Sequence, residues 1–364
     1  MKILHFLYEL VSGGAERFVV DLANAQYAAG NEVTICILRP LNERSGFNRQ
    51  FLVPGVGFES LGIGSGITPG KMAAVRKYIE SADPDILHCH HNILPYLALT
   101  VFRKKKPVIV HTVHSAAERA NKNKAERAFC KFLYRHGMVT PVTISQECRR
   151  SFLRVYSTDA ECIYNGRSFM APSGNEASVR SEIDSYKRSG SSLVFVHVGR
   201  CHLVKNQQLL VEAFNRLDRD GVDFVLIVIG AAFDSPAGQE LQRIASPNIH
   251  FVGEKDNVAD YLMNADAFCL TSKSEGLSIS LLEALQCGVT PICTPVGGNT
   301  DVVSDGETGY LSSDLSLESY VDALCRYLNN PIDREELKRY FRKHFSMDAC
   351  AAGYNTLYRK LLNK

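Results

Sequence analysis

The stretch LVFVHVGRCHLVKNQQLLVEAFNRLDRDGVDFVLIVIG, residues 193–230, decides the fold because it reads as one strand–helix–strand unit. LVFVHVG and DFVLIVIG are short, continuous apolar runs of the kind that form buried strands. NQQLLVEAFNRL, which lies between them, carries apolar residues at helical spacing. A strand, a helix and a second strand in this order join neighbouring parallel strands.

The same alternation extends along the chain in both directions. Helical patterns such as residues 15–30 and 280–288 separate the other strand-like runs. These runs are KILHFL (2–7), EVTICIL (32–38), DILHCH (85–90), PVIVHTV (107–113), VTIS (142–145), IHFVG (249–253), AFCLTS (267–272) and VTPICT (289–294). The pattern predicts parallel sheets with crossover helices.

Residues 168–192 interrupt the alternation, since they are rich in Ser, Gly and charge, and we interpret them as the domain junction with a short helix. A chain of 364 residues also exceeds one ordinary hydrophobic core. We therefore predict an α/β protein of two doubly wound, Rossmann-like domains that face each other across a cleft. They cover residues 1–170 and 190–346, and a helix at 347–364 packs back on the first. Ligands of such sheets bind at the carboxyl ends of the strands.

Composition indicates a soluble globular protein, with 45% hydrophobic and 22% charged residues. No apolar run reaches the ~18 residues of a membrane-spanning helix. The N-terminal MKILHFLYEL is interpreted as a first strand, because a signal peptide needs a longer apolar stretch and a cleavage site. The eleven cysteines form no C-x-x-C pair, and several lie in apolar runs, which favours reduced thiols in a cytoplasmic protein.

The loop after the first strand, ELVSGGAE at residues 9–16, is the first candidate site. Gly13 and Gly14 allow close approach of a ligand to the backbone. A helix starting near Ala15 would direct its free N–H groups and positive dipole end there. A tight turn that merely requires glycine remains an equal alternative. The G-x-G-x-x-G fingerprint of dinucleotide binding is missing from this loop.

The second candidate site, VGRCHLVKN at residues 198–206, follows the first strand of the second domain. Arg200 and Lys205 would stand at the strand's carboxyl end, where together they can neutralise a diphosphate. The alternative is a pair of solvated surface cations.

The third candidate site, SKSEGLSISLLEAL at residues 272–285, is the most specific. Glu275 precedes a predicted helix, and Glu283 lies inside it; both can accept hydrogen bonds from sugar hydroxyls. Gly276 and Leu277 are expected to present backbone N–H groups at the helix start. Two alternatives stay open: Ser280-x-x-Glu283 also fits a capping box, and Glu275 could simply face a helix dipole.

Histidines at 88–91, H-C-H-H, suggest a metal site only superficially. His88 and His90 share one face of a strand and His91 takes the other, so the three converge poorly. D-P-D at 83–85 is interpreted as a turn and a helix end. We therefore expect no metal held by side chains and no cofactor.

In order and spacing, the motifs resemble family 4 of the retaining glycosyltransferases, which have the GT-B fold. The resemblance spans nearly the whole chain. It rests on SGGAE, VIVHTVHS (108–115), YNG (164–166), GRxxxxKN, Ex7E, PVGG and DGETGYL (305–311).

The resemblance implies roles for the matched residues. Glu275 would contact the donor sugar and Glu283 the ribose, while Arg200 and Lys205 would hold the diphosphate. Gly13 and Gly14 would touch phosphate or acceptor, and His114, rather than His111, would line the sugar pocket. The chain departs from the family pattern at two places: Asp301 replaces a glutamate, and Arg167-Ser168 replace a hydrophobic residue and an aspartate.

The resemblance implies transfer of a hexose or N-acetylhexosamine from a nucleotide sugar, with UDP the default nucleotide, to a hydroxyl acceptor. Surface polysaccharide and glycolipid synthesis are the expected settings, and nucleic acid is not an expected partner. Two alternatives stay open: a sugar-nucleotide epimerase of the same fold and a non-catalytic sugar-nucleotide-binding subunit.

Positive charge is concentrated in residues 103–154, which hold 13 basic and 3 acidic side chains, a net charge of +10. Within them, residues 117–136 are expected to form one basic helix with an apolar stripe; its cations are Lys122, Lys124, Arg127, Lys131 and Arg135. The helix is either an ordinary crossover helix or a peripheral anchor on the anionic inner face of a membrane.

Overall fold

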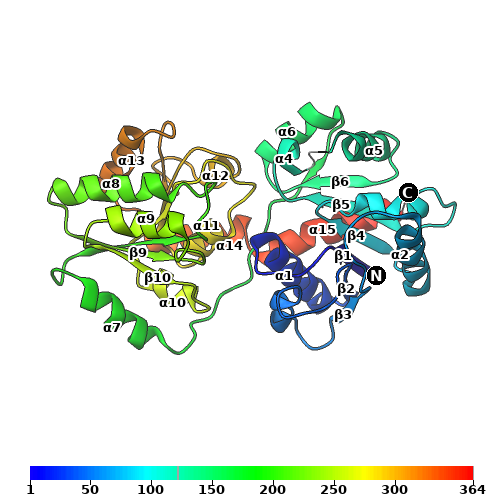
Figure 1. The fold of residues 1–364 in the computed structure, drawn as a ribbon, viewed down its shortest axis with the longest axis horizontal. Helices are drawn as coiled ribbons and strands as arrows, with labels where there is room; N and C mark the ends of the chain where they lie inside the picture. Colours follow the sequence, from blue (N-terminus) through cyan, green and yellow to red (C-terminus); the bar gives the residue numbers. More distant parts are fainter. Residues whose placement is uncertain (121–122, 364) are drawn as a thin grey trace. The chain divides into compact units, whose positions relative to one another are not determined.

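The computed structural model describes residues 1–120 and 123–363 and divides into two compact units. The N-terminal unit comprises residues 1–168 and the C-terminal segment from Phe345; the C-terminal unit comprises residues 169–344 (Figure 1). Each unit holds one parallel sheet with helices on both faces, so the predicted α/β fold class is confirmed. Among the described residues, no helix has the length and apolarity needed to cross a bilayer.

The N-terminal unit is built on a seven-stranded sheet of order β3-β2-β1-β4-β5-β6-β7. Its strands are β1 (Lys2–Leu7), β2 (Glu32–Ile37), β3 (Gly57–Ser60), β4 (Ile86–His90), β5 (Val108–Val113), β6 (Thr140–Thr143) and β7 (Glu161–Cys162). Its helices are α1 (Gly14–Ala28), η1 (Phe47–Phe51), α2 (Pro69–Ala82), η2 (Leu94–Leu97), α3 (Ala98–Val101), α4 (Ala117–Ala120), α5 (Lys124–Arg135), α6 (Gln146–Tyr156) and α15 (Met347–Leu362).

The C-terminal unit is built on a six-stranded sheet of order β10-β9-β8-β11-β12-β13. Its strands are β8 (Leu193–Val198), β9 (Phe224–Ile229), β10 (Ile249–Gly253), β11 (Ala267–Leu270), β12 (Thr290–Cys293) and β13 (Tyr310–Leu311). Its helices are α7 (Glu176–Tyr186), α8 (Gln207–Arg219), α9 (Pro236–Ile244), α10 (Val258–Met263), α11 (Ile279–Gln286), α12 (Asn299–Val302), α13 (Leu317–Asn329) and α14 (Arg334–His344).

Strand order places a topological switch point in each sheet. In the N-terminal unit the chain turns back between β1 and β4, and in the C-terminal unit between β8 and β11. Loops that leave the carboxyl ends of such strand pairs diverge and form the usual ligand site of doubly wound sheets. The candidate loops 9–16, 199–206 and 271–278 all leave these strands.

Three predicted boundaries differ from the structure. The region 117–136 is not one helix, because α4 ends at Ala120 and Asn123 caps a new helix through hydrogen bonds from the N–H groups of Ala125 and Glu126. Lys122 lies outside the described residues. β6 ends at Thr143 rather than Ser145, since Ser145 is the N-cap of α6. The C-terminal unit takes in residues 169–189, which the sequence assigns to the junction, and α7 is the short helix expected there.

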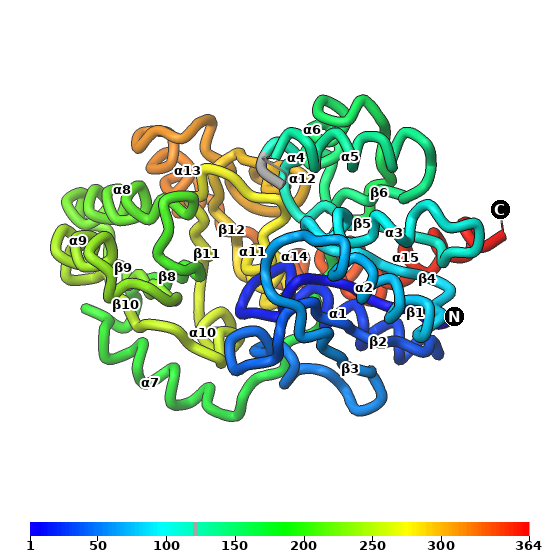
Figure 2. Tube along the Cα trace, turned by 45° about the vertical axis from the view of Figure 1, so that its right-hand side comes forward, coloured from blue at the N-terminus to red at the C-terminus, as the bar shows by residue number. Residues whose placement is uncertain are grey.

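The C-terminal helix α15 packs against α1 and β5 of the N-terminal unit (Figure 2). Arg167, one of the two departures from the family pattern, anchors its start. The Arg167 backbone exchanges hydrogen bonds with Phe345 O (3.0 Å) and Met347 N (3.1 Å). Its guanidinium forms a buried ion pair with Asp21 of α1. The neighbouring Gly166 is required because a Cβ atom there would lie 2.6 Å from Ser346 O.

Replacement of Arg167 by Leu is expected to destabilise the N-terminal unit by about 2–3 kcal/mol, because the buried Asp21 carboxylate loses one charged partner and keeps Arg17, whose Nε atom lies 3.1 Å from Asp21 Oδ1. Urea unfolding followed by circular dichroism measures the change. Arg150→Leu is the matched control: its ion pair with Glu147 is solvent-exposed, so the expected loss is below about 1 kcal/mol. Equal losses in both variants would contradict a special contribution from the buried pair.

Candidate active site

In the C-terminal unit, two loops meet at the switch point. Thr271, at the end of β11, donates a hydrogen bond from Oγ1 to the carbonyls of Lys205 and Asn206, both at 3.1 Å. Lys273 N donates to Val204 O at 2.7 Å. Asn206 adopts φ 53° at the N-cap of α8, a left-handed conformation that Asn tolerates better than most residues. This conformation explains the Lys-Asn pair in the sequence motif.

Lys205 and Glu275 form an ion pair across these two loops. Lys205 Nζ lies 2.8 Å from Glu275 Oε1, and the same oxygen accepts a hydrogen bond from Ser272 Oγ at 2.6 Å. The side chains are 23% and 12% exposed, so the pair is mostly shielded from water. Sequence analysis missed Ser272. The exposed Arg200 side chain lies on the same loop as Lys205, with no ion pair to an acid among the described residues.

The glycines of the Pro-Val-Gly-Gly motif are needed because their loop packs directly against the backbone of the loop that carries Glu275. Gly297 has φ 55°, and a Cβ atom there would sit 1.8 Å from Glu275 O. A Cβ atom on Gly298 would sit 2.2 Å from Gly276 O, and Gly298 N donates to that oxygen at 2.9 Å. Larger residues would displace the loop that carries Glu275. Asp301, the shorter acid, follows in the one-turn helix α12.

Helix α11 starts later than predicted. Ser278 is its N-cap and Ile279 its first residue, so its free N–H groups do not come from Gly276 and Leu277. The capping-box alternative for Glu283 is wrong for the same reason, because Ser280 lies inside the helix instead of capping it. Glu283 is partly exposed on α11. Its expected role at a ribose stays a prediction.

In the N-terminal unit, Gly13 is the N-cap of α1 and Gly14 its first residue. The Glu16 carboxylate folds back to this turn, where its Oε2 atom would lie 2.3 Å from a Cβ atom on Gly13. Glu16 Oε1 also lies 3.4 Å from Nε2 of His91, the residue that follows β4. The loops after β1 and β4 therefore bring a carboxylate and an imidazole together, and neither was identified as a site residue from the sequence.

His111 of β5 and His114 of the following loop differ in how many of their ring nitrogens have hydrogen-bond partners. His111 uses both: Nδ1 bonds Tyr134 OH at 2.7 Å, and Nε2 donates to His91 O at 2.6 Å. His114 bonds His90 Nδ1 through Nε2 at 3.0 Å, but its Nδ1 atom is buried without a hydrogen-bond partner. This difference supports His114, rather than His111, as the residue that meets a ligand.

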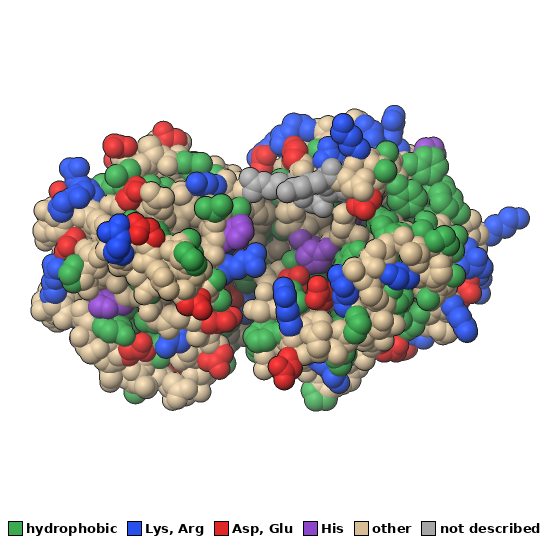
Figure 3. Space-filling view, in the orientation of Figure 1, with side chains coloured by type: hydrophobic (Ala, Val, Ile, Leu, Met, Phe, Trp, Pro, Cys, Tyr) green, Lys and Arg blue, Asp and Glu red, His purple; other side chains and the backbone are tan. Residues whose placement is uncertain are grey.

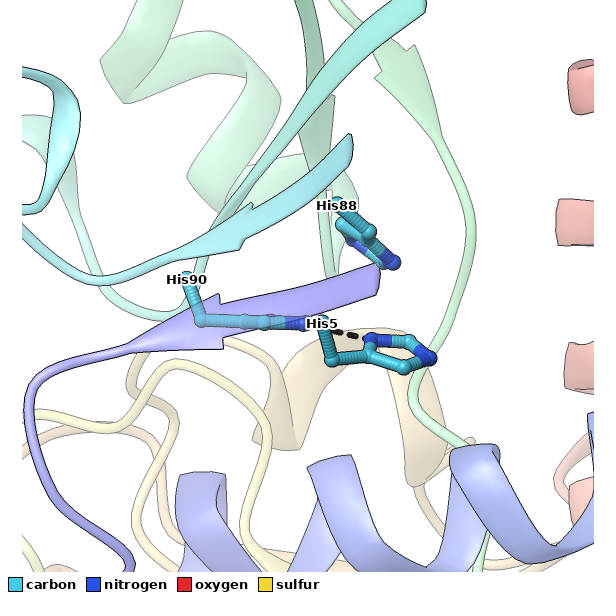
Figure 4. Close-up of side chains that lie close together, drawn as sticks. All are labelled: His5, His88 and His90. Atoms are coloured by element: carbon cyan, nitrogen blue, oxygen red, sulfur yellow. Dashed lines mark hydrogen bonds between the residues drawn. The ribbon is translucent and has the colours of Figure 1, made fainter. Parts of the chain in front are cut away.

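Next to His114 lies a cluster of three histidines, of which sequence analysis missed His5 (Figure 4). His5 of β1 pairs in register with His88 of β4, so their side chains emerge side by side, and His90 follows two residues later on the same face. One ring nitrogen from each of the three lies within 4.8 Å of the other two, close enough for metal ligation. All six nitrogens already have hydrogen-bond partners, however, so the cluster is satisfied without an ion. The predicted poor convergence considered His91 and overlooked His5.

Burial keeps these imidazoles neutral. Desolvation lowers the pKa of His5 to about 4, despite a hydrogen bond to Gln26 that opposes the shift. Desolvation likewise lowers the pKa of His111 to about 4 and holds the pKa of His88, His90 and His114 well below the usual value. The cluster therefore acts through hydrogen bonds at neutral pH.

Family models match both halves of the chain. The model described as Glycosyltransferase Family 4 matches residues 12–168, and the one described as Glycosyl transferases group 1 matches residues 179–344. Phosphatidyl-myo-inositol mannosyltransferase of Mycobacterium tuberculosis is 23% identical over 89% of this chain and 86% of its own. N-acetyl-alpha-D-glucosaminyl L-malate synthase of Bacillus anthracis is 30% identical, but the match spans only 49% of this chain and 48% of that protein.

Solved structures show the same fold. The HepE protein of Anabaena, in complex with UDP and glucose, superposes with a TM-score of 0.80 at 16% identity, covering 99% of this chain and 100% of that one. A glycosyltransferase from Rickettsia africae reaches 0.83 at 15% identity, covering 99% and 98%. With the two family matches, these findings show that the chain belongs to family 4 of the glycosyltransferases and has the GT-B fold.

Proposed function

We propose that this enzyme transfers a hexose or N-acetylhexosamine, with retention of configuration, from a UDP-sugar to a hydroxyl acceptor in the synthesis of a surface polysaccharide or glycolipid. The shielded Lys205–Glu275 pair at the switch point is the observation that carries the proposal. HepE, a neighbour in fold, was solved with UDP. One relative, from Escherichia coli, is named as a UDP-Gal transferase acting on a diphosphoundecaprenol-linked GlcNAc.

In the proposed mechanism the protein supplies charge and position rather than a covalent intermediate. As the bond between sugar and phosphate stretches, negative charge builds on the leaving diphosphate, and Arg200 and Lys205 stabilise it. Fixed donors of this kind lower a barrier by about 3 kcal/mol. Glu275 holds the Lys205 ammonium in place and accepts hydrogen bonds from the donor sugar. The acceptor hydroxyl attacks from the face that the diphosphate leaves, and its proton passes to the departing diphosphate as the new glycosidic bond forms.

The proposal is tested by incubating the purified protein with UDP-sugars and GDP-sugars, first alone and then with lipid-linked and soluble glycan acceptors. Release of free nucleotide that requires an acceptor, with an α-linked product from an α-linked donor, is the expected result. Tight binding of a nucleotide sugar without turnover would favour a non-catalytic subunit. Conversion of the free donor to its epimer would identify an epimerase.

Glu283→Ala is expected to weaken UDP binding about tenfold or more, with a smaller effect on the turnover of saturated enzyme. The reason is that a ribose contact is equal in ground and transition states. Calorimetry with UDP measures the change. Glu240→Ala is the control, since the one ion pair of Glu240 within the described part of the chain is with exposed Arg243 on α9. Unchanged UDP affinity in Glu283→Ala would exclude the ribose role.

We further propose that the N-terminal unit binds an anionic membrane surface through α3, α5 and the loop between α3 and β5. Phe102 and Phe132 are 58% and 40% exposed, and their ring centroids lie 6.2 Å apart. Four neighbouring cations have no acidic partner among the described residues: Lys104, Lys105, Lys124 and Arg135. Figure 3 shows basic side chains along this edge of the unit, with hydrophobic side chains beside them.

The basic arginines of α6 contribute less, because Arg149, Arg150 and Arg154 are each paired with a carboxylate. About four unpaired cations at roughly 1 kcal/mol each, with two partly inserted rings, give reversible binding. The protein should sediment with vesicles containing phosphatidylserine and leave them at about half-molar salt. Lys104→Gln with Lys105→Gln should weaken binding, whereas Arg150→Gln should not. Equal sedimentation with neutral vesicles would contradict the electrostatic component.

A further inference from the structure

A chain of eight hydrogen-bonded side chains runs through the N-terminal unit behind His114. It is fully buried for most of its length and connects β1, α1, β4, β5 and α15. In order, its members are His114, His90, His5, Gln26, Tyr358, His88, Thr112 and Tyr354, with distances between neighbouring partner atoms of 2.7–3.3 Å.

The Gln26 amide gives this chain a direction. Its Oε1 atom faces His5 Nε2 at 2.8 Å, and its Nε2 atom faces Tyr358 OH at 3.3 Å. An amide oxygen only accepts, so His5 carries its proton on Nε2 and must accept at Nδ1. His90 Nε2 therefore donates to His5 Nδ1, and His90 in turn accepts at Nδ1 from His114 Nε2. With the amide oxygen on the His5 side, His5, His90 and His114 are each the tautomer protonated on Nε2; exchanging the amide oxygen and nitrogen would reverse every step.

The hydrogen-bonded chain ends at His114 Nδ1. When the protons lie in this direction, Nδ1 carries no hydrogen and presents a lone pair. That atom is buried and has no hydrogen-bond partner. A buried acceptor without a donor is unfavourable, and such groups in native proteins call for an explanation such as a ligand. The reverse direction would leave an orphaned N–H donor, which native structures avoid more strongly than an orphaned acceptor.

We propose that His5, His90 and Gln26 are positioning residues which lock His114 in one tautomer, so that its Nδ1 atom accepts a hydrogen bond from a hydroxyl group of a bound sugar. The inference rests on the proposed sugar-transfer function. The hydroxyl belongs either to the donor sugar or to the acceptor, and the chemistry of recognition is the same for both.

His114 stays neutral because of its burial and of the titratable groups that surround it. The titratable groups around it are His90 and His91 from β4 and its end, His111 from β5, and Glu16 from α1, which reaches His91. Desolvation and the nearby His91 and His111 hold the pKa of His114 well below its usual value. The lone pair is therefore available throughout the neutral range.

The first test needs neither substrate nor mutation. In protein labelled with ¹⁵N-histidine at neutral pH, two-bond ¹H–¹⁵N correlation spectra report which ring nitrogen carries the proton. The expected pattern for His114, assigned by its loss in His114→Gln, is a neutral ring protonated on Nε2. A proton on Nδ1, or a mixture of tautomers, would overturn the proposal even if the enzyme transferred sugars as proposed.

A matched pair of variants tests the positioning role. In His90→Asn, Oδ1 replaces Nδ1 as the acceptor for His114; in His90→Leu, of nearly the same shape, no acceptor remains. His90→Asn should retain the single His114 tautomer and most activity. His90→Leu should lose the single tautomer and about tenfold in transfer rate, with unchanged UDP affinity. Thermal melting shows whether both variants are folded. If both are folded and behave identically, the hydrogen-bonded chain has a purely structural role and the proposal is refuted.

Two rate measurements on His90→Leu identify the hydroxyl. If hydrolysis of the nucleotide sugar without acceptor falls together with transfer, the hydroxyl lies on the donor. If hydrolysis is unchanged and transfer falls, it lies on the acceptor. If the tautomer shifts and neither rate falls, His114 Nδ1 meets no sugar hydroxyl. If wild-type protein turns over no nucleotide sugar, the sugar-transfer function fails, while the tautomer result still stands.

Discussion

Between pH 7 and pH 5.5 the folded protein is expected to lose about 5 kcal/mol or more of its stability, chiefly in the N-terminal unit. Five buried histidines there have pKa values held below the ordinary range: His5, His88, His90, His111 and His114. In the unfolded chain each titrates near pH 6.5. At pH 5.5 each group then costs roughly 1 kcal/mol or somewhat more.

The sign follows from proton binding. Below pH 6.5 the unfolded state binds more protons than the folded state, so stability falls as pH falls. The stability contributed by the neutral histidines is fully present only well above pH 6.5. As the pH falls through 6.5, this contribution declines, and it continues to decline until the folded-state pKa values are reached, which for His5 and His111 are about 4. Ordinary carboxyl groups titrate below about pH 4.5, so the interval from 7 to 5.5 reports the histidines.

Calorimetric unfolding in buffers of different ionisation enthalpy measures how many protons the protein takes up when it unfolds. His197 and His250 of the C-terminal unit also have pKa values that burial lowers, in His197 to about 4, so these seven groups should together take up about five to six protons on unfolding at pH 5.5. His197→Gln should remove about one of them, whatever it does to absolute stability. Uptake of fewer than about two protons would show that the cluster is already charged in the folded state.

Sequence periodicity was sufficient to predict the elements that carry the core. The continuous apolar runs at β8 and β9, and the helical spacing between them, occur where they were expected. The two-residue strands β7 and β13 could not be predicted, because their pairing partners, not their own residues, define them. The break before α5 had a readable signal that was overlooked: Asn123-x-x-Glu126 is a helix N-terminal signature, and Asn123 does cap that helix.

The site residues that could be predicted are those next to predicted strands, and those that could not be predicted depend on how the strands are ordered in the sheet. Lys205 and Glu275 were identified because each follows a strand, and the parallel sheet brings both loops to one edge. The histidine chain was missed because it depends on the order β1–β4–β5, which places His5 beside His88 from 83 positions away in sequence. Arg167 departs from the family pattern, and only the packing of α1 against α15 shows why a cation is buried there. Such contacts depend on topology, which local patterns do not encode.

Glu275→Gln and Lys205→Ala are each expected to lower turnover by about two to three orders of magnitude, with a much smaller effect on UDP binding by Glu275→Gln. The two side chains act as one unit, because Lys205 Nζ and Glu275 Oε1 lie 2.8 Å apart and are largely shielded from solvent. Loss of a fixed group that stabilises charge in the transition state costs this much in other enzymes. Gln preserves the shape of Glu275 and its contact with Ser272, so the change isolates the charge.

The pair makes a sharper prediction than either residue alone. If Glu275 orients the Lys205 ammonium toward the leaving diphosphate, the double variant should be about as slow as the slower single variant, because the second change removes what the first has already disabled. Independent roles would instead multiply the two losses. Lys273→Ala is the control: its exposed side chain lies on the same loop as Glu275, outside the ion pair, and turnover should stay within about threefold of wild type. Steady-state rates of the wild type, the two single variants and the double variant, with saturating donor and acceptor, decide between the two cases. Near wild-type rates in both single variants would show that the diphosphate binds elsewhere.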